Sequence, residues 1–226
     1  MSLYRNVLTC IFAFGLLLAK PLVTSAQVNP NVQFWAFGKV YLTSGDTIAG
    51  SISHFKDQEV IKVDQPGKAT YTFSPVNLDR FVVKDDNLLT YREFRTLFWN
   101  RTNNPNGSKS PAFFEYLQGG TYSLIKRETF LFVGSATPAS TNAITNIVTD
   151  RLVGPDIGNK HYSLVIMYYL LTPDDKIIQL PKPKKDLPEL FGKRVYQMKA
   201  FIKENNLNYS KEHDLKVIMR YYNSLL

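Results

Sequence analysis

The chain has 226 residues, of which 27 are lysine or arginine and 19 are aspartate or glutamate, and its formal net charge at pH 7 is +8. This length fits one domain, or one domain with an appendage. The single cysteine, Cys10, lies in an apolar N-terminal segment, which excludes thiol catalysis and cysteine-based metal sites from the rest of the chain.

Residues 1–26 are predicted to be a secretory signal peptide. Arg5 precedes an apolar run at 7–19, and small residues follow up to Ala26, an order typical of such signals. The run is shorter than the roughly 20 residues that a membrane helix needs, so no transmembrane span is expected after cleavage between Ala26 and Gln27. The alternative is a retained N-terminal anchor. Export without disulfides indicates a bacterial protein that is periplasmic or secreted.

The middle of the chain has the alternation and turn chemistry of β-strands. In residues 47–55, Ile48, Gly50 and Ile52 fall on one face. The preceding Ser44-Gly45-Asp46 suits a hairpin turn, and it lacks the oxygen ligands of a calcium loop and the glycines of a phosphate loop. Ten strands are predicted, at 34–42, 47–55, 59–64, 69–73, 79–85, 88–94, 111–117, 121–133, 161–172 and 176–180.

After Pro183 the apolar period changes to that of helices. One helix is predicted with Asp186 as its cap and a kink or split at Gly192, and a second with Ser210 as its cap. Residues 134–160 are rich in Ser, Thr, Asn, Gly and Pro and are expected to form a long polar loop, with room for a short helix at 143–152.

These elements predict a mainly β (α+β) fold, an antiparallel barrel or sandwich of about ten short strands with a C-terminal helical hairpin. The expected organisation is a β domain at 27–181 and a hairpin at 182–226 that packs on it. An outer-membrane barrel is disfavoured, because the chain ends in helices and the strand around 164–171 reads as buried on both faces.

Several motifs occur in a suggestive order: "GKVYLTSGDTIAGSI", "YTFSPVNLDRFVV", "FFEYLQGGTYSLIKR" and "KKDLPELFGKRVYQMKAFIKENNL". Together they resemble a group of uncharacterised secreted β-rich proteins of Gram-negative bacteria, which open with a glycine, a strand and a GDTIxG turn and end in a helical pair. The resemblance implies a location and a shape. It implies no activity and no cofactor.

Signals for catalysis are sparse. The histidines at 54, 161 and 213 lack the spacing of a metal site, and no Gly-x-Ser-x-Gly turn occurs. The candidate is Glu115, set between Phe113-Phe114 and Tyr116-Leu117, because burial would raise the pKa of an inward carboxyl and make it an acid. The alternative is that Glu115 faces solvent or pairs with a lysine or arginine. No metal and no cofactor are expected.

Two kinds of ligand-binding candidate remain. Trp99, beside a polar loop, offers a ring on which a sugar could stack, although such a residue more often covers a sheet edge. Residues 182–226 hold ten basic and five acidic residues, including Lys193, Arg194, Lys199 and Lys203. Export argues against nucleic acid as a partner, so an anionic envelope surface is the candidate, and a solvated helix face is the simpler interpretation.

The sequence therefore favours a secreted or periplasmic β-domain protein with a non-catalytic structural or binding role in the cell envelope. The alternative is an envelope hydrolase that acts on glycan or ester, with Glu115 or a histidine at its centre. A third hypothesis is a protein held on a surface by its basic C-terminal helices.

Overall fold

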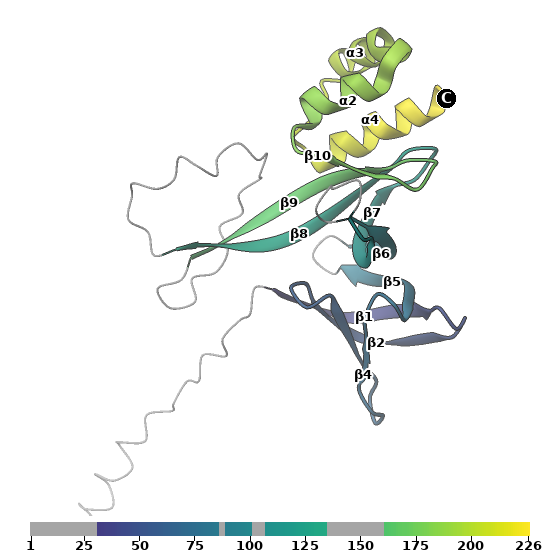
Figure 1. Ribbon diagram of the computed structural model, residues 1–226, viewed down its shortest axis with the longest axis vertical. Coiled ribbons are helices and arrows are strands. Elements are labelled where there is room, and N and C mark those ends of the chain that lie inside the picture. The colour runs from purple at the N-terminus through teal and green to yellow at the C-terminus, as the bar shows by residue number, and fades with distance from the viewer. Residues whose placement is uncertain (1–30, 86–88, 101–106, 135–160) are drawn as a thin grey trace, which may run out of the picture.

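The computed structural model describes residues 31–85, 89–100, 107–134 and 161–226. The predicted signal peptide with Ala26 and Gln27, and the polar loop beyond Gly134 with its short helix, lie outside the described residues. The strands are β1 (Val32–Leu42), β2 (Thr47–Phe55), β3 (Val60–Asp64), β4 (Tyr71–Phe73), β5 (Leu78–Asp85), β6 (Thr90–Trp99), β7 (Ser110–Gln118), β8 (Ser123–Gly134), β9 (His161–Leu171) and β10 (Ile177–Leu180) (Figure 1).

All ten strands lie in one antiparallel sheet with the order β10-β9-β8-β7-β6-β5-β1-β2-β3-β4. The predicted class, mainly antiparallel β with C-terminal helices, is confirmed. The strands form neither the expected closed barrel nor a two-sheet sandwich: they lie in one open sheet, whose end strands β10 and β4 do not pair with each other. Those two strands have only four and three residues, and β10 leads almost directly into a helix. Short end strands and a covering helix are common ways of protecting sheet edges.

The hairpin turns follow the predicted chemistry. At the β1–β2 turn, the Leu42 N–H donates to the Asp46 carbonyl at 2.8 Å, and Gly45 has a φ of 93°. The Ser44 hydroxyl donates to the Asp46 carboxylate at 2.8 Å. This positive φ is accessible to glycine without steric cost, so the SGDT segment is a structural bend between two strands.

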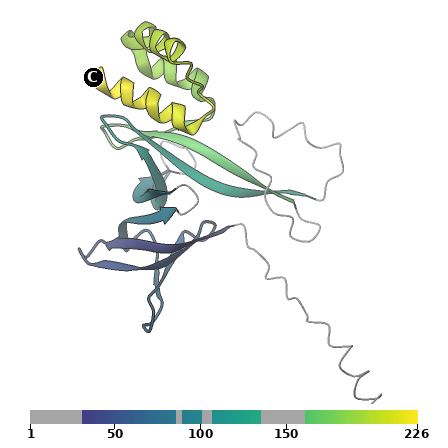
Figure 2. The same ribbon diagram turned by 180° about the vertical axis from the view of Figure 1, so that it is seen from behind.

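The sheet curls along its length (Figure 2). The β2–β3 turn thereby contacts β7 and β8 across the concave face. Lys56, which follows β2, forms an ion pair with Glu128 of β8 at 2.7 Å. Glu59, at the start of β3, accepts a hydrogen bond from the Phe113 N–H of β7 at 3.0 Å. Because three strands, β6, β5 and β1, separate β2 from β7 in the sheet, these contacts arise from curvature and not from strand pairing.

Two apolar cores lie on the concave face. The first, inside the curled half, contains Trp35, Val40, Ile52, Ile61, Val63, Leu78, Phe81, Val83, Phe94 and Phe113. The second, between β8–β10 and the helices, contains Leu124, Tyr168, Leu170, Leu180, Leu187, Phe191, Met198, Ile202, Leu215, Ile218, Met219 and Tyr222. A smaller cluster of Ala112, Phe114, Ile125 and Tyr169 lies on the convex face.

The helices are α2 (Pro183–Phe191), α3 (Val195–Glu204) and α4 (Glu212–Ser224). The predicted split is confirmed, since Gly192 has a φ of 50° and begins a 3-10 turn between α2 and α3. The predicted caps are wrong. The first helix begins at Pro183, whose fixed φ suits a first helical position, and the Asp186 carboxylate accepts the Lys182 N–H at 2.7 Å from inside the helix. The last begins at Glu212, two residues after Ser210.

Helix α4 is tied to the β7–β8 turn by Asn223. The Asn223 side chain accepts the Tyr122 N–H at 2.9 Å and donates to the Tyr122 carbonyl at 2.8 Å. Gly120, with a φ of 155°, leaves room for this amide, because a Cβ at that position would collide with the Asn223 side chain. These contacts, together with the second core, pack the helices on the sheet.

Candidate functional site

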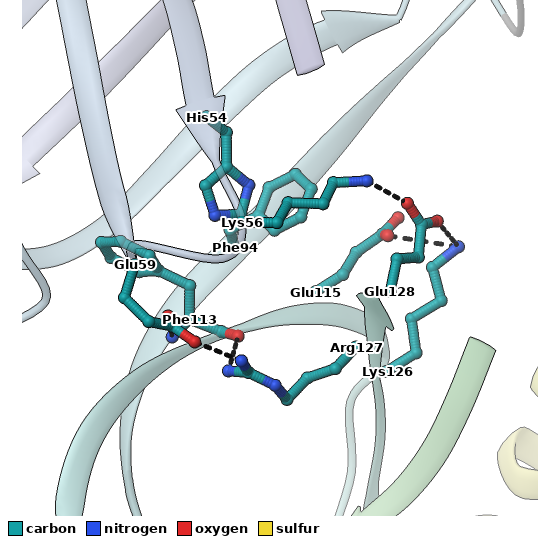
Figure 3. Close-up of a pocket in the computed structure, with 9 residues that line it drawn as sticks. All are labelled: His54, Lys56, Glu59, Phe94, Phe113, Glu115, Lys126, Arg127 and Glu128. Carbon is teal, nitrogen blue, oxygen red and sulfur yellow. Dashed lines mark hydrogen bonds and ion pairs between the residues drawn. The ribbon is translucent and has the colours of Figure 1, made fainter. Parts of the chain in front are cut away.

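A cluster of buried charges lies on the concave face between the two apolar cores. It comprises the cations Lys56, Arg92 and Lys126 and the carboxylates Asp85, Glu115, Glu128 and Glu212. The sheet contributes most of these groups, and Glu212 comes from the first turn of α4. We refer to these seven residues as the charged cluster. Part of it lines the pocket in Figure 3.

Glu115, the predicted catalytic candidate, lies at the centre of this cluster. Its carboxylate accepts two hydrogen bonds from Arg92, Nε to Oε1 at 2.9 Å and Nη2 to Oε2 at 2.6 Å. The Lys126 ammonium lies 3.2 Å from Oε2. Glu115 is 6% exposed, so it is buried, as the acid hypothesis requires. It is also paired with Arg92 and Lys126, as the alternative hypothesis expects. Such two-bonded arginine–carboxylate pairs are strong and directional.

The cations of the cluster determine the ionisation of Glu128. Burial raises the pKa of this carboxyl, but Lys56, Lys126 and Arg92 outweigh it and lower the pKa to about 2. The converse holds for Lys126. Burial would lower the pKa of its ammonium, but Glu115, Glu128 and Glu212 raise it well above the ordinary value. The cluster is therefore held charged by mutual compensation.

His54 is buried beside this cluster, at 6% exposure, among aromatic rings. Its ring packs edge-on against Phe81, Phe94 and Phe113, with centroids 5.6 to 5.9 Å away, and its Nδ1 has no hydrogen-bond partner among the described residues. Burial, then Lys56 and Arg127, lower the pKa of His54 to about 3, so the imidazole is neutral at neutral pH.

The cavity that His54 and the cluster enclose is small (Figure 3). Its volume is about 20 Å³, and its walls include Lys56, Glu115 and Arg127. The Arg127 guanidinium closes one side, where it pairs with Glu59 and donates to the Phe113 carbonyl at 2.8 Å. This volume holds about one water molecule, whereas sites for small-molecule ligands are typically about 300 Å³ or more.

Trp99 lies at the end of β6, partly buried in the convex aromatic cluster. Its ring packs edge-on against Phe114 at 5.5 Å and Tyr169 at 5.6 Å, and the Arg127 guanidinium lies 5.1 Å from it. These contacts account for Trp99 as a packing residue on the face of the sheet, and because β6 is an inner strand, the ring does not cover a sheet edge. Trp99 does not share a site with Glu115 or with the basic residues of α3.

The basic candidates Lys193, Arg194, Lys199 and Lys203 are all exposed, on α3 and the turn before it. No ion pair joins any of the four to a described residue. Tyr196 lies among them and is 83% exposed. The helices lie at one end of the molecule and β1–β2 at the other in both views (Figures 1 and 2), so these residues are remote from the curled half of the sheet.

A larger hollow lies on the convex face, which sequence reasoning did not single out. Its volume is about 300 Å³, and we call it the outer groove. It crosses β1, β5 and β6 and is lined by Phe37, Gly38, Lys39, Tyr41, Val82 and Tyr91. Phe37 is 50% and Tyr91 67% exposed, so two aromatic rings stand open to solvent here.

The described residues hold no group of three or more His, Cys, Asp or Glu side chains arranged for a metal ion. His213 is exposed in the first turn of α4, and the side chain of His161 lies outside what is described. Within the same ranges, no helix has the length and apolar character needed to cross a membrane.

Comparison with known proteins identifies no relative of this chain. No protein-family model, no curated protein and no solved structure matches the chain.

Sequence reasoning identified Glu115 and missed its partners. A usable signal was present in the strand alternation: Arg92 falls on the same strand face as Phe94, and Lys126 on the same face as Leu124. A basic residue at an inward position of a strand needs a buried carboxylate. Charged residues at inward strand positions therefore indicated a buried cluster. They did not indicate which carboxylate would pair with which cation.

Proposed function

We propose that this chain is a secreted or periplasmic protein with a non-catalytic structural or binding role in the cell envelope. The observation that carries the proposal is the state of Glu115. Its carboxylate is bonded twice to Arg92, lies near Lys126 and borders a cavity of about 20 Å³. A general acid must reach the proton acceptor on its substrate, and this carboxyl is enclosed by its own partners.

The same geometry weighs against the alternative, an envelope hydrolase. Glycoside cleavage needs two carboxyls on either side of an accessible bond, and the carboxylates near Glu115 share its cations inside the fold. His54, the other buried candidate, is enclosed by three phenylalanine rings. The charged cluster is better suited to joining the curled half of the sheet to α4, through Lys126 and Glu212 at 2.7 Å.

The location rests on the N-terminal segment, in which a positive residue, an apolar run and small residues up to Ala26 have the order of a cleavable signal. A neutral to basic chain without cysteine after Gln27 is compatible with the periplasm, where free thiols are oxidised.

The test is expression of the full chain, with its own N-terminus, in a Gram-negative host. The chain should be recovered in the periplasmic or culture fraction, and it should leave a panel of glycans, peptidoglycan fragments and ester substrates uncleaved. Cleavage of any of these, abolished by Glu115→Gln at a temperature at which circular dichroism shows both proteins folded, would establish the hydrolase instead.

One observation favours a second role, attachment to an anionic surface. Four exposed cations, Lys193, Arg194, Lys199 and Lys203, lie around the exposed ring of Tyr196. Basic side chains attract anionic headgroups over about one Debye length, and an aromatic ring is suited to the interface. This role is compatible with the first, because the basic face and the charged cluster lie on different elements.

A further inference from the structure

The outer groove is built by an irregularity in β1. Between Trp35 and Gly38, β1 advances three residues while its partner β2 advances two, from Ile52 to Gly50. The extra residue is a β-bulge, and it breaks the alternation so that Ala36 and Phe37 are both exposed. Without the bulge, Phe37 would point to the same face as buried Trp35. The bulge therefore places the Phe37 ring on the convex face. Because the ring is half exposed there, packing in a core does not explain its position.

Gly38 completes the floor of this groove. A Cβ at Gly38 would lie 2.5 Å from the Ile52 side chain and 2.9 Å from the Val82 carbonyl oxygen, so only glycine allows β1 to approach its neighbours this closely. Tyr91 forms the far wall of the groove. It lies on β6, where it is paired with Lys84 of β5. The groove is thus set by the backbone of three hydrogen-bonded strands.

The groove also carries one cation without a partner. Two arginines on the same face are occupied: Arg80 stacks on Tyr41 at 4.1 Å and pairs with Asp79, and Arg95 pairs with Glu93 at 2.6 Å. Lys39 is exposed between Phe37 and Tyr41, and it forms no ion pair with any described residue. An ammonium between aromatic rings is complementary to an anionic group on a ring-shaped ligand.

We infer that the outer groove binds an acidic sugar unit of a glycan chain. Phe37 and Tyr91 offer ring faces to the apolar side of a pyranose, and Lys39 pairs with its carboxylate. The volume of about 300 Å³ fits one or two sugar units, and the open convex face allows a chain to continue in both directions. Phe34, 62% exposed and three residues before Phe37, lies roughly 10 Å further along the strand, a spacing suited to a next unit.

This inference rests on the proposed binding role and specifies its ligand class. The first probe is a galacturonic acid hexamer, and the second is the same hexamer with its carboxyls methyl-esterified, which keeps the rings and removes the charge. Titrations of the full exported chain would use calorimetry, with chromatography of the sugar afterwards. The variants are Tyr91→Ala and Lys39→Gln, with Tyr71→Ala and Lys68→Gln as controls, an exposed ring on β4 and an exposed cation in the turn before it.

The expected result is that the acidic hexamer binds more tightly than its ester, and that Tyr91→Ala weakens binding of both at least tenfold. Lys39→Gln should remove the preference for the acid, and the two controls should bind as wild type. The inference is overturned if neither hexamer binds at millimolar concentration, or if Lys68→Gln weakens binding as much as Lys39→Gln, which indicates unspecific attraction. Binding followed by shortening of the hexamer would instead overturn the non-catalytic role.

Discussion

Arg92 and Glu115 lie diagonally across the β6–β7 pair and share two hydrogen bonds, at 2.9 and 2.6 Å, with both side chains less than a tenth exposed. Around this pair, Lys126 and Glu128 complete a charged cluster that separates two apolar cores. Removal of Glu115 leaves the buried Arg92 guanidinium with only its longer contacts, 3.3 Å to Asp85 and to Glu128, which is more costly than loss of a surface pair.

Glu115→Gln is therefore expected to lower the free energy of unfolding by about 3–5 kcal/mol, because Arg92 and Lys126 lose their shared carboxylate. For a chain of this size the melting temperature should fall by roughly 10 °C. Urea denaturation followed by circular dichroism measures the change. The matched control is Glu93→Gln on β6, whose pair with Arg95 is a third or more exposed and should cost about 1 kcal/mol or less. Equal effects of the two substitutions would contradict the structural role of Glu115.

His54 is expected to make the protein less stable as the pH falls below about 6.5. Its pKa is lowered to about 3 in the fold, so the unfolded chain binds a proton near pH 6.5 that the folded chain does not. Stability is complete above pH 6.5, and by pH 4.5 it should have fallen by about 2–3 kcal/mol. Below pH 4.5 the carboxyl of Glu128, with a pKa lowered to about 2, adds a second loss.

Urea midpoints measured between pH 7 and 4.5 test this expectation. In His54→Phe the new ring packs against three phenylalanines and the adjoining small cavity, so the slope between pH 6.5 and 4.5 should flatten while stability at pH 7 is kept. His213→Asn, at an exposed histidine, is the control and should retain the wild-type slope. An unchanged slope in His54→Phe would show that the pH dependence has another origin.

Asn223 is expected to hold α4 on the sheet. Asn223→Ala leaves the N–H and carbonyl of Tyr122 without their partner and should cost about 1–3 kcal/mol. Hydrogen exchange should rise in 212–224 more than in β5 and β6. Ser224→Ala is the control, at an exposed neighbour whose hydroxyl donates to the Tyr221 carbonyl within the same helix. Uniform exchange across the whole chain would argue that the helices and the sheet unfold as one unit.

Export predicts a defined N-terminus. The chain recovered from the periplasm or medium should begin at Gln27, which intact-mass spectrometry resolves directly. Ala26→Pro should block processing, because proline next to the scissile bond is a poor cleavage substrate, and Lys68→Gln in an exposed turn should not. A chain recovered in the membrane fraction with residues 1–26 still attached would favour the retained anchor.

Attachment through α3 predicts binding that depends on salt. Vesicles with 30% anionic lipid should retain the protein at 20 mM salt and release most of it at 500 mM, because the Debye length shortens severalfold. Lys199→Glu with Lys203→Glu should abolish retention, and Lys39→Gln on the opposite end should leave it intact. Retention that persists at high salt would contradict an electrostatic attachment.

The strands were predictable because alternation and turn chemistry are local. All ten predicted segments coincide with strands, and Gly67, with a φ of 71°, forms the expected turn after Pro66. The helical pair and its break at Gly192 follow from the same kind of local preference. The caps were mistaken because Asp186 and Ser210 each lie near a helix start, and sequence alone does not decide which nearby residue begins the helix.

The candidate sites were harder to predict from the sequence. Glu115 could be singled out as a carboxyl among aromatics, but whether it is a free acid or an ion-pair partner depends on Arg92, 23 residues away, and on Lys126. The outer groove depends on a bulge, which shifts the face of Phe37 relative to the simple alternation of β1. One extra residue reverses which side chains face outward, and no local sequence pattern predicted this bulge.

The sequence by itself determined where strands, turns and helices occur, because steric preferences of φ and ψ and the two apolar periods act between residues close in the chain. Only the tertiary structure decided that the sheet remains open and curls, and that Lys56 meets Glu128 across 72 residues. Those contacts depend on the register and curvature of strands that are distant in sequence, and charges interact according to their separation in space and their burial, which the chain order does not specify.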